Sequence, residues 1–117
     1  MNENELKRIG FDRENFFEWM TKEISQQREL FIVKSRQYAT IDPLANFRTA
    51  AMARYGNGSY NSMFLEAKSY AMKHIAHLIN NDTTGPKIEE SLGDIAVYCL
   101  IMKYMAEMDK MDKKEDL

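Results

Sequence analysis

Two acidic residues one helical turn apart, Glu90 and Asp94, are the strongest candidates for chemistry in this sequence. They lie in the stretch IEESLGDIAVYCLIMKYM, residues 88–105, which we predict to be one helix. The spacing of four residues points both carboxylates in the same direction. Val97 and Ile101 continue the same line, and a lone charge beside an apolar surface is costly to desolvate. The pair therefore predicts a bound cation.

The chemistry of this pair favours Mg²⁺ or Mn²⁺. Both metals prefer carboxylate and water ligands, and Mg²⁺ is usually held by one or two carboxylates plus substrate phosphates. Glu66 could supply a third carboxylate, while His74 and His77 could bind phosphate, donate hydrogen bonds or ligate a metal. Zinc is disfavoured because the two histidines are three residues apart and no cysteine or further histidine lies nearby. Cations available to neutralise phosphate are Lys34, Arg48 and Lys73.

The alternative is that these acids have only a structural role. Glu89 and Glu90 fall in the first turn of the predicted helix, where negative charge favours the helix dipole whatever the function. Asp94 lies beyond that turn, so the dipole does not explain it. No glycine-rich phosphate loop or nucleophile motif is present, so an activated water is the expected nucleophile of any hydrolytic reaction.

Composition describes a single globular domain. The 117 residues carry a net charge of -2 and are 44% hydrophobic, which excludes a disordered chain and a surface that coats DNA or RNA. No apolar run reaches the roughly 18 residues of a membrane span. The polar start, without a leader pattern, predicts a cytoplasmic protein. The single cysteine, Cys99, is expected to be a small buried hydrophobe.

The spacing of apolar residues and the positions of helix-capping and helix-breaking residues predict four helices and no strand. A polar arm, residues 1–11, precedes a helical domain over residues 12–108, and a charged tail over residues 109–117 is expected to fray. The helices are expected from Asp12 or Asn15 to about Tyr38, from Pro43 to about Arg54, from Ser59 or Asn61 to about Asn80, and from Ile88 to about Met105. Short links and one short helix predict an all-α, antiparallel four-helix bundle.

The expected core faces follow from helical spacing. In the last helix the predicted core stripe is Ile88, Leu92, Ile95, Cys99 and Met102. In the third it is Leu65, Met72, Ile75, Ala76 and Ile79, with a separate polar side of Glu66, Tyr70, Lys73, His74 and His77. The stripe of the first helix passes from Phe16, Phe17, Met20, Ile24 and Phe31 to the polar groups Gln27, Lys34 and Tyr38, which either fray toward solvent or line a pocket.

Four segments together resemble a known family. KSRQY at 34–38, DPLANF at 42–47, KHI at 73–75 and IEESLGDIAVY at 88–98 are similar to small phage proteins of the MazG-like group. That group belongs to the all-α nucleoside triphosphate pyrophosphohydrolases, a superfamily that includes dimeric dUTPases. The resemblance covers most of residues 30–105 and implies a MazG-type fold.

The resemblance also implies an activity and a site. Such proteins cleave nucleoside triphosphates to monophosphate and pyrophosphate with Mg²⁺ held by acids on two helices. Glu90 and Asp94 match the acidic motif of the last helix, with Glu66 a further possible ligand. Phosphates would meet Lys34, Lys73 and His74, with His77 nearby, and base or sugar would meet Tyr38, Asn46 and Phe47.

One departure from the family leaves alternatives open. Well-characterised members carry a Glu-x-x-Glu pair on an earlier helix, whereas residues 59–80 here contain a single acid, Glu66. A non-catalytic protein that sequesters a nucleotide, or a helical interaction module, would tolerate this loss. The resemblance further implies a homodimer or homotetramer with a partner-facing stripe of Val97, Ile101 and Met108, in the host cytoplasm if the protein is phage-encoded.

Overall fold

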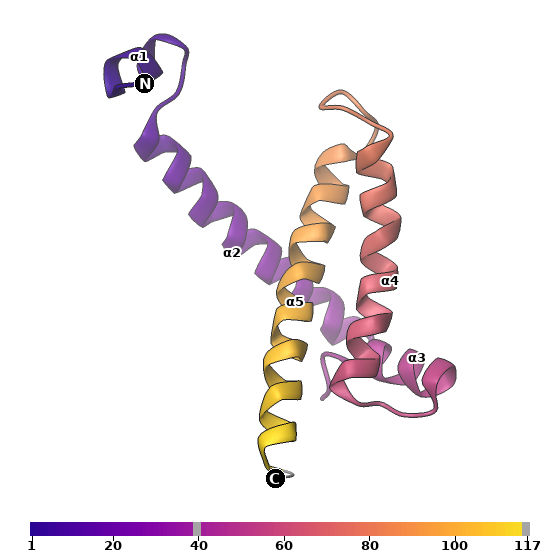
Figure 1. Ribbon diagram of the computed structural model, residues 1–117. Helices are drawn as coiled ribbons and strands as arrows, with labels where there is room; N and C mark the ends of the chain where they lie inside the picture. The colour runs from indigo at the N-terminus through magenta and orange to yellow at the C-terminus, as the bar shows by residue number, and fades with distance from the viewer. Residues whose placement is uncertain (39–40, 116–117) are drawn as a thin grey trace.

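The chain folds into helices joined by short turns (Figure 1). The computed structural model describes residues 1–38 and 41–115, and this part of the chain contains five helices and no strand. The prediction of an all-α protein is confirmed. The helices are α1 (Glu3–Arg8), α2 (Arg13–Tyr38), α3 (Ala45–Tyr55), α4 (Tyr60–Ile79) and α5 (Ile88–Glu115).

Helices α4 and α5 form the centre of the molecule as an antiparallel pair (Figure 1). Ser59 begins α4 by accepting a hydrogen bond from the backbone N–H of Ser62, as its predicted capping role requires. The ring of Tyr60 meets that of Tyr104 near one end of the pair, and Tyr70 meets Tyr98 further along. These contacts set the register that brings particular side chains of α4 and α5 together.

The short helix α3 packs across α4 and is held at both ends. It begins at Ala45, two residues later than predicted, because Pro43 and Leu44 form a turn, closed by a hydrogen bond from Ala45 N to Asp42 O, instead of the first helical residues. The Asp42 carboxylate accepts hydrogen bonds from Leu44 N at 2.9 Å and from Arg48 Nε at 2.8 Å. Gly56, at φ 79°, ends the helix in the left-handed conformation that glycine adopts without strain.

The hydrophobic core lies where α3, α4 and α5 meet. Its buried members are Phe47, Ala51, Met63, Ala67, Ile101 and Met105. Two alanines on α3 and α4 leave room for the larger methionines, so the three helices approach closely at this point.

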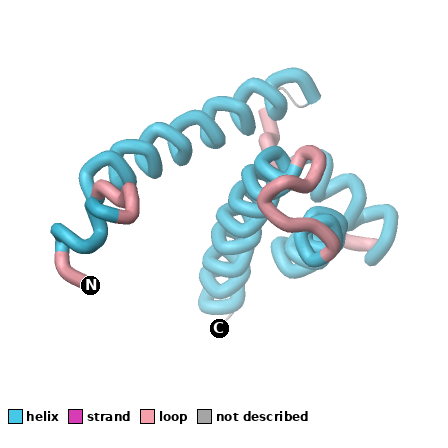
Figure 2. The backbone as a smooth tube through the Cα atoms, turned by 90° about the horizontal axis from the view of Figure 1, so that it is seen from above, coloured by secondary structure: helices cyan, strands magenta, loops and turns pink. Residues whose placement is uncertain are grey.

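Helix α2 is only partly covered by the rest of the chain. Its N-terminal half, together with α1, extends away from the other helices in both views (Figures 1 and 2). Asp12 caps it as predicted, accepting from Asn15 N at 3.1 Å. Further along, Gln27 lies over Gly93 of α5, where an added Cβ would come within 2.8 Å of the Gln27 Nε2 atom. Since α2 does not pack along its length, the MazG-type bundle stays a prediction.

The predicted core stripe of α5 is wrong at two of its positions. Leu92 and Cys99 are exposed, so Cys99 is not the buried hydrophobe that its spacing indicated. The face turned inward carries Ile101 and Met105, which also removes Ile101 from the predicted partner-facing stripe. Because α5 is apolar on both sides, periodicity finds two stripes and cannot say which of them meets α4.

Helix α4 shows the same reversal. Met72 and Ile79 of its predicted core stripe are exposed, and the buried side carries Met63, Ala67 and Ala71 instead. The small alanines allow α5 to approach, whereas Leu65 and Ile75 of the predicted stripe are only half-buried. The adjacent side, which holds Tyr70 and His74, consequently faces α5.

Both ends of the described chain are more helical than expected. The predicted polar arm contains α1, whose N-cap Asn2 accepts a hydrogen bond from Glu5 N at 2.9 Å. Helix α5 continues to Glu115 through much of the predicted fraying tail, and an ion pair of 3.0 Å between Lys113 and Asp109 supports this extension. Within residues 1–38 and 41–115, none of the helices has the length and apolarity needed to cross a bilayer.

The Asp42–Arg48 pair predicts an acid-dependent stability. The hydrogen bond from Arg48 lowers the pKa of Asp42 below its ordinary value of 3.8. A lowered pKa stabilises the fold above pH 3.8, and this contribution is lost as the pH falls through the folded-state pKa. In urea unfolding, Asp42→Asn should therefore be less stable than the parent at neutral pH and approach it in acid. A difference that does not change with pH would contradict this account.

Candidate functional site

The predicted acid Asp94 lies between α4 and α5, facing His74 across the pair. Its Oδ2 atom is 3.6 Å from His74 Nε2, and the two side chains are 31% and 29% exposed. The Asp94 side chain is thus neither fully exposed to solvent nor fully buried. The register of α4 and α5 described above produces this contact, and the sequence pattern predicted both residues as site members without predicting that they touch.

Aromatic rings stack beside this acid and histidine. The His74 ring lies 5.8 Å from that of Tyr98 at an interplanar angle of 30°, and Tyr98 lies 6.3 Å from Tyr70 at 28°. Phe47 meets Tyr98 edge-on at 6.2 Å and anchors both tyrosines to the core. We name Phe47, Tyr70, His74, Asp94 and Tyr98 the α4–α5 cluster.

A positive charge lies beside the α4–α5 cluster. The Nζ atom of Lys73 lies 5.7 Å from the centre of the Tyr70 ring, a cation–π arrangement at the exposed edge of the cluster. Burial raises the pKa of Tyr98 above its ordinary value of 10.0, and the charges of Asp94 and Tyr70 raise it further. Tyr98 is therefore a neutral phenol at physiological pH, able to donate a hydrogen bond.

Glu90 is exposed one turn before Asp94 on α5. Since residues four apart on a helix share a side, its carboxylate can reach the solvent in front of Asp94. These two acids are the part of the predicted metal site that the structure places on one surface. Glu89 is also exposed.

Glu66 lies elsewhere, against α3. It is 1% exposed, and its Oε1 atom is 2.9 Å from Arg54 Nε. That contact has ion-pair distance, yet Oε1 accepts no well-aligned hydrogen bond from a described residue. Glu66 precedes His74 by eight residues on α4, which is about 12 Å along the helix axis. In the described ranges, no three side chains of His, Cys, Asp or Glu gather closely enough to hold a metal ion.

The Arg54–Glu66 pair yields a stability prediction. Arg54→Ala leaves the buried carboxylate without its cation, so the free energy of unfolding should fall by about 1–3 kcal/mol. Urea unfolding measures the loss, with Lys68→Ala on the exposed side of α4 as the control. Adding Glu66→Leu to Arg54→Ala should restore part of the lost stability, because the double variant no longer buries an unpaired carboxylate. Equal stability of parent and Arg54→Ala would show that Glu66 does not depend on this cation.

Three further predicted site residues are not members of the α4–α5 cluster. The Nε2 atom of His77 is 2.7 Å from the carbonyl oxygen of Pro86, so its ring ties α4 to the turn before α5. Lys34 and Asn46 are exposed. The side chain of Tyr38 lies outside the described part of the structure, and its predicted contact with base or sugar stays a prediction.

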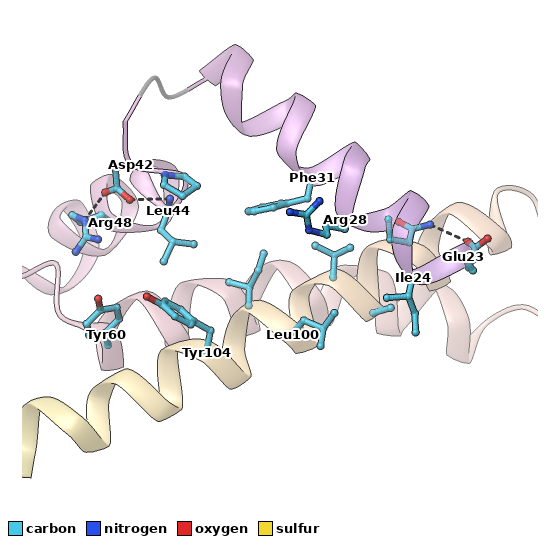
Figure 3. Close-up of a pocket in the computed structure, with 15 residues that line it drawn as sticks. Glu23, Ile24, Arg28, Phe31, Asp42, Leu44, Arg48, Tyr60, Leu100 and Tyr104 are labelled. Carbon is cyan, nitrogen blue, oxygen red and sulfur yellow. Dashed lines mark hydrogen bonds and ion pairs between the residues drawn. The ribbon is translucent and has the colours of Figure 1, made fainter. Parts of the chain in front are cut away.

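A groove lies on a different side of α5 (Figure 3). It encloses about 610 Å³ between α2, the start of α3 and α5. Phe31 and Leu44 point into it, and Leu100 and Tyr104 form its floor (Figure 3). Its walls are mostly apolar, so it is a poor site for triphosphate. Of the three polar groups that the pocket interpretation of the α2 stripe predicted, Gln27 lines this groove, Lys34 is exposed and does not line it, and the side chain of Tyr38 lies outside the described residues.

Comparison with known proteins adds no identification. No protein-family model matches the chain, and neither the characterised proteins nor the solved structures contain a match. The function of the chain is therefore inferred from its geometry.

Proposed function

We propose that this protein binds a nucleoside triphosphate at the α4–α5 cluster and hydrolyses it to a monophosphate and pyrophosphate. The observation that carries the proposal is the half-buried Asp94 carboxylate, 3.6 Å from His74 and beside the stacked rings of Tyr70 and Tyr98. An acid for a divalent ion, donors for phosphate and flat faces for a base meet there on two neighbouring helices.

Mg²⁺ or Mn²⁺ fits this proposal as a metal shared with the substrate. Asp94 and Glu90 supply two carboxylates, which is what Mg²⁺ usually takes from a protein when phosphate oxygens complete its shell. Glu66 is left out of the proposed ligands because its carboxylate is held by Arg54. When bound, the metal would neutralise phosphate charge and lower the pKa of a bound water.

The residues of the chain have separate roles in the proposed reaction. Lys73 and His74 would meet phosphate oxygens, and Tyr98 would donate a hydrogen bond from its phenol to the same group. Stacking on an aromatic ring contributes about 1–3 kcal/mol per base and tolerates every base, so Tyr70 and Tyr98 would hold the ring without selecting it. Water attacks a phosphorus atom, the bond to the leaving pyrophosphate breaks, and the proton of the water passes to solvent or to a nearby base.

A non-catalytic nucleotide-binding protein is the second candidate. The observation that favours it is the acidic set, since the described residues bring together two possible metal carboxylates and not three. Binding through stacking and phosphate contacts would survive this loss. In either form we propose a cytoplasmic protein that assembles as a homo-oligomer and has no membrane or direct nucleic-acid contact.

A substrate panel separates these proposals. The purified protein is incubated with ribo- and deoxynucleoside triphosphates and Mg²⁺, and both products and binding are measured. Equimolar monophosphate and pyrophosphate support the hydrolase, and saturable binding without product supports the binding protein. Neither product nor binding would discard both and favour the helical interaction module.

A further inference from the structure

We infer that the groove between α2 and α5 receives the N-terminal part of α2 from a second copy of this chain. We call that part, residues 13–22, the α2 arm. The inference describes how the homo-oligomer of the proposed function would assemble. It requires no nucleotide, so it can be tested whether or not the protein binds one. Three features of the chain support it: its excess surface, the face of the α2 arm and the chemistry of the groove.

The chain exposes far more surface than a compact monomer of its mass. Its accessible surface is 9202 Å², whereas about 6,600 Å² is expected for a folded monomer of 13.7 kDa. The radius of gyration is 18.1 Å, against about 13 Å for a compact domain of this length. The excess is about 2,600 Å² per chain, or about 5,200 Å² for two chains, and obligate homodimer interfaces bury about 2,000–5,000 Å² or more in total. A second copy is thus an occupant of the right size.

The α2 arm continues a face that is already used for packing. Ile24 and Phe31 line the groove against α5, and Met20 and Phe17 lie on the same side of α2 one and two turns earlier. Both of these arm residues are exposed, and the contacts that Phe17 makes with Phe16 and Arg13 lie within the same helix. The arm leaves the rest of the molecule in the two perpendicular views (Figures 1 and 2).

The groove offers the complementary surface. Leu100 on its floor is 62% exposed, and the neighbouring walls are Val97, Leu44 and Phe31. Large apolar side chains of an arm would displace water from these walls, which is favourable in proportion to the area covered. Because each chain has one arm and one groove, a two-fold arrangement fills both grooves and covers both arms with the same contact used twice.

Solution mass measured by light scattering after gel filtration tests the inference. We expect the parent to have twice the chain mass of 13.7 kDa, or a higher multiple. Leu100→Arg in the groove and Met20→Arg in the arm should each raise the dissociation constant by at least about 100-fold. The matched control is Met72→Arg, an equally drastic change at an exposed methionine of α4 away from the groove. It should keep the parental mass.

Cross-linking locates the contact. In a Cys99→Ser background, Phe17→Cys and Leu100→Cys are made in separate chains, which are mixed and oxidised. A disulfide between the two different chains supports the arm in the groove. A single-chain mass at all concentrations would overturn the inference. An oligomer that resists both arginine variants and forms no mixed disulfide would overturn the placement of the arm, whatever the protein does with nucleotides.

Discussion

Asp94→Asn should lower the rate of pyrophosphate release at least about 100-fold. The amide keeps the size of the side chain but removes the charge that faces His74 and would hold the divalent ion. Losing one group that stabilises developing charge commonly costs a factor of 10²–10³ in kcat. Pyrophosphate release under saturating nucleotide and Mg²⁺ measures the effect, and helix content by circular dichroism reports on the fold.

A matched variant controls for general effects of charge removal on α5. Glu107→Gln neutralises an exposed acid of the same helix outside the α4–α5 cluster, and its rate should equal that of the parent. If Asp94→Asn releases pyrophosphate at the parental rate, Asp94 does not belong to the site. Equal losses in both variants would attribute the effect to the charge of the helix instead of the cluster.

Met105→Ala should lower the free energy of unfolding by about 2–5 kcal/mol. Met105 has no exposed surface and belongs to the core shared by α3, α4 and α5, so truncation leaves a cavity that these helices can only partly close. Met111→Ala on the same helix is the control, because Met111 is exposed and its loss should stay within about 0.5 kcal/mol. Similar losses for both variants in urea unfolding would contradict the assignment of the core.

The local structure could be predicted because its causes are local. Ser59 and Asp12 cap their helices, and Gly56 ends α3, each as its residue type indicates. Two boundaries were missed for equally local reasons. The Asp42 carboxylate accepts hydrogen bonds from Leu44 N and Arg48 Nε, and α3 begins later than predicted. The ion pair between Lys113 and Asp109 supports the continuation of α5 into the expected tail.

The choice of packed faces could not be predicted from one sequence. Helices α4 and α5 are each apolar on more than one side. In α5, the spacing of apolar residues supports the stripe through Cys99 and the stripe through Ile101 equally well. What decides is the shape of the neighbour: Ala67 and Ala71 let α5 approach on one side of α4, and that choice exposes Cys99. Such a preference depends on three-dimensional fit and leaves no periodic signal.

The candidate site was predicted in part for the same reason. Asp94 and His74 were both identified by residue type, but their contact depends on the register of α4 and α5. The stacking of Tyr98 on His74 was missed, although an aromatic residue one turn after Asp94 was visible in the sequence. Glu66 has the residue type of a ligand and lies against Arg54 instead, a pairing between α3 and α4 that no sequence spacing predicts.

The nucleotide proposal depends on where a triphosphate binds, and the two histidines of the chain allow this to be observed directly. His74 belongs to the α4–α5 cluster, while the ring of His77, one turn further, is tied to Pro86. Ring signals of both are followed by NMR as a non-hydrolysable nucleoside triphosphate analogue is added with Mg²⁺. The account predicts a saturable shift of the His74 signals that clearly exceeds that of His77 and is lost in Asp94→Asn. Signals of His74 that stay unchanged at saturating analogue would contradict it.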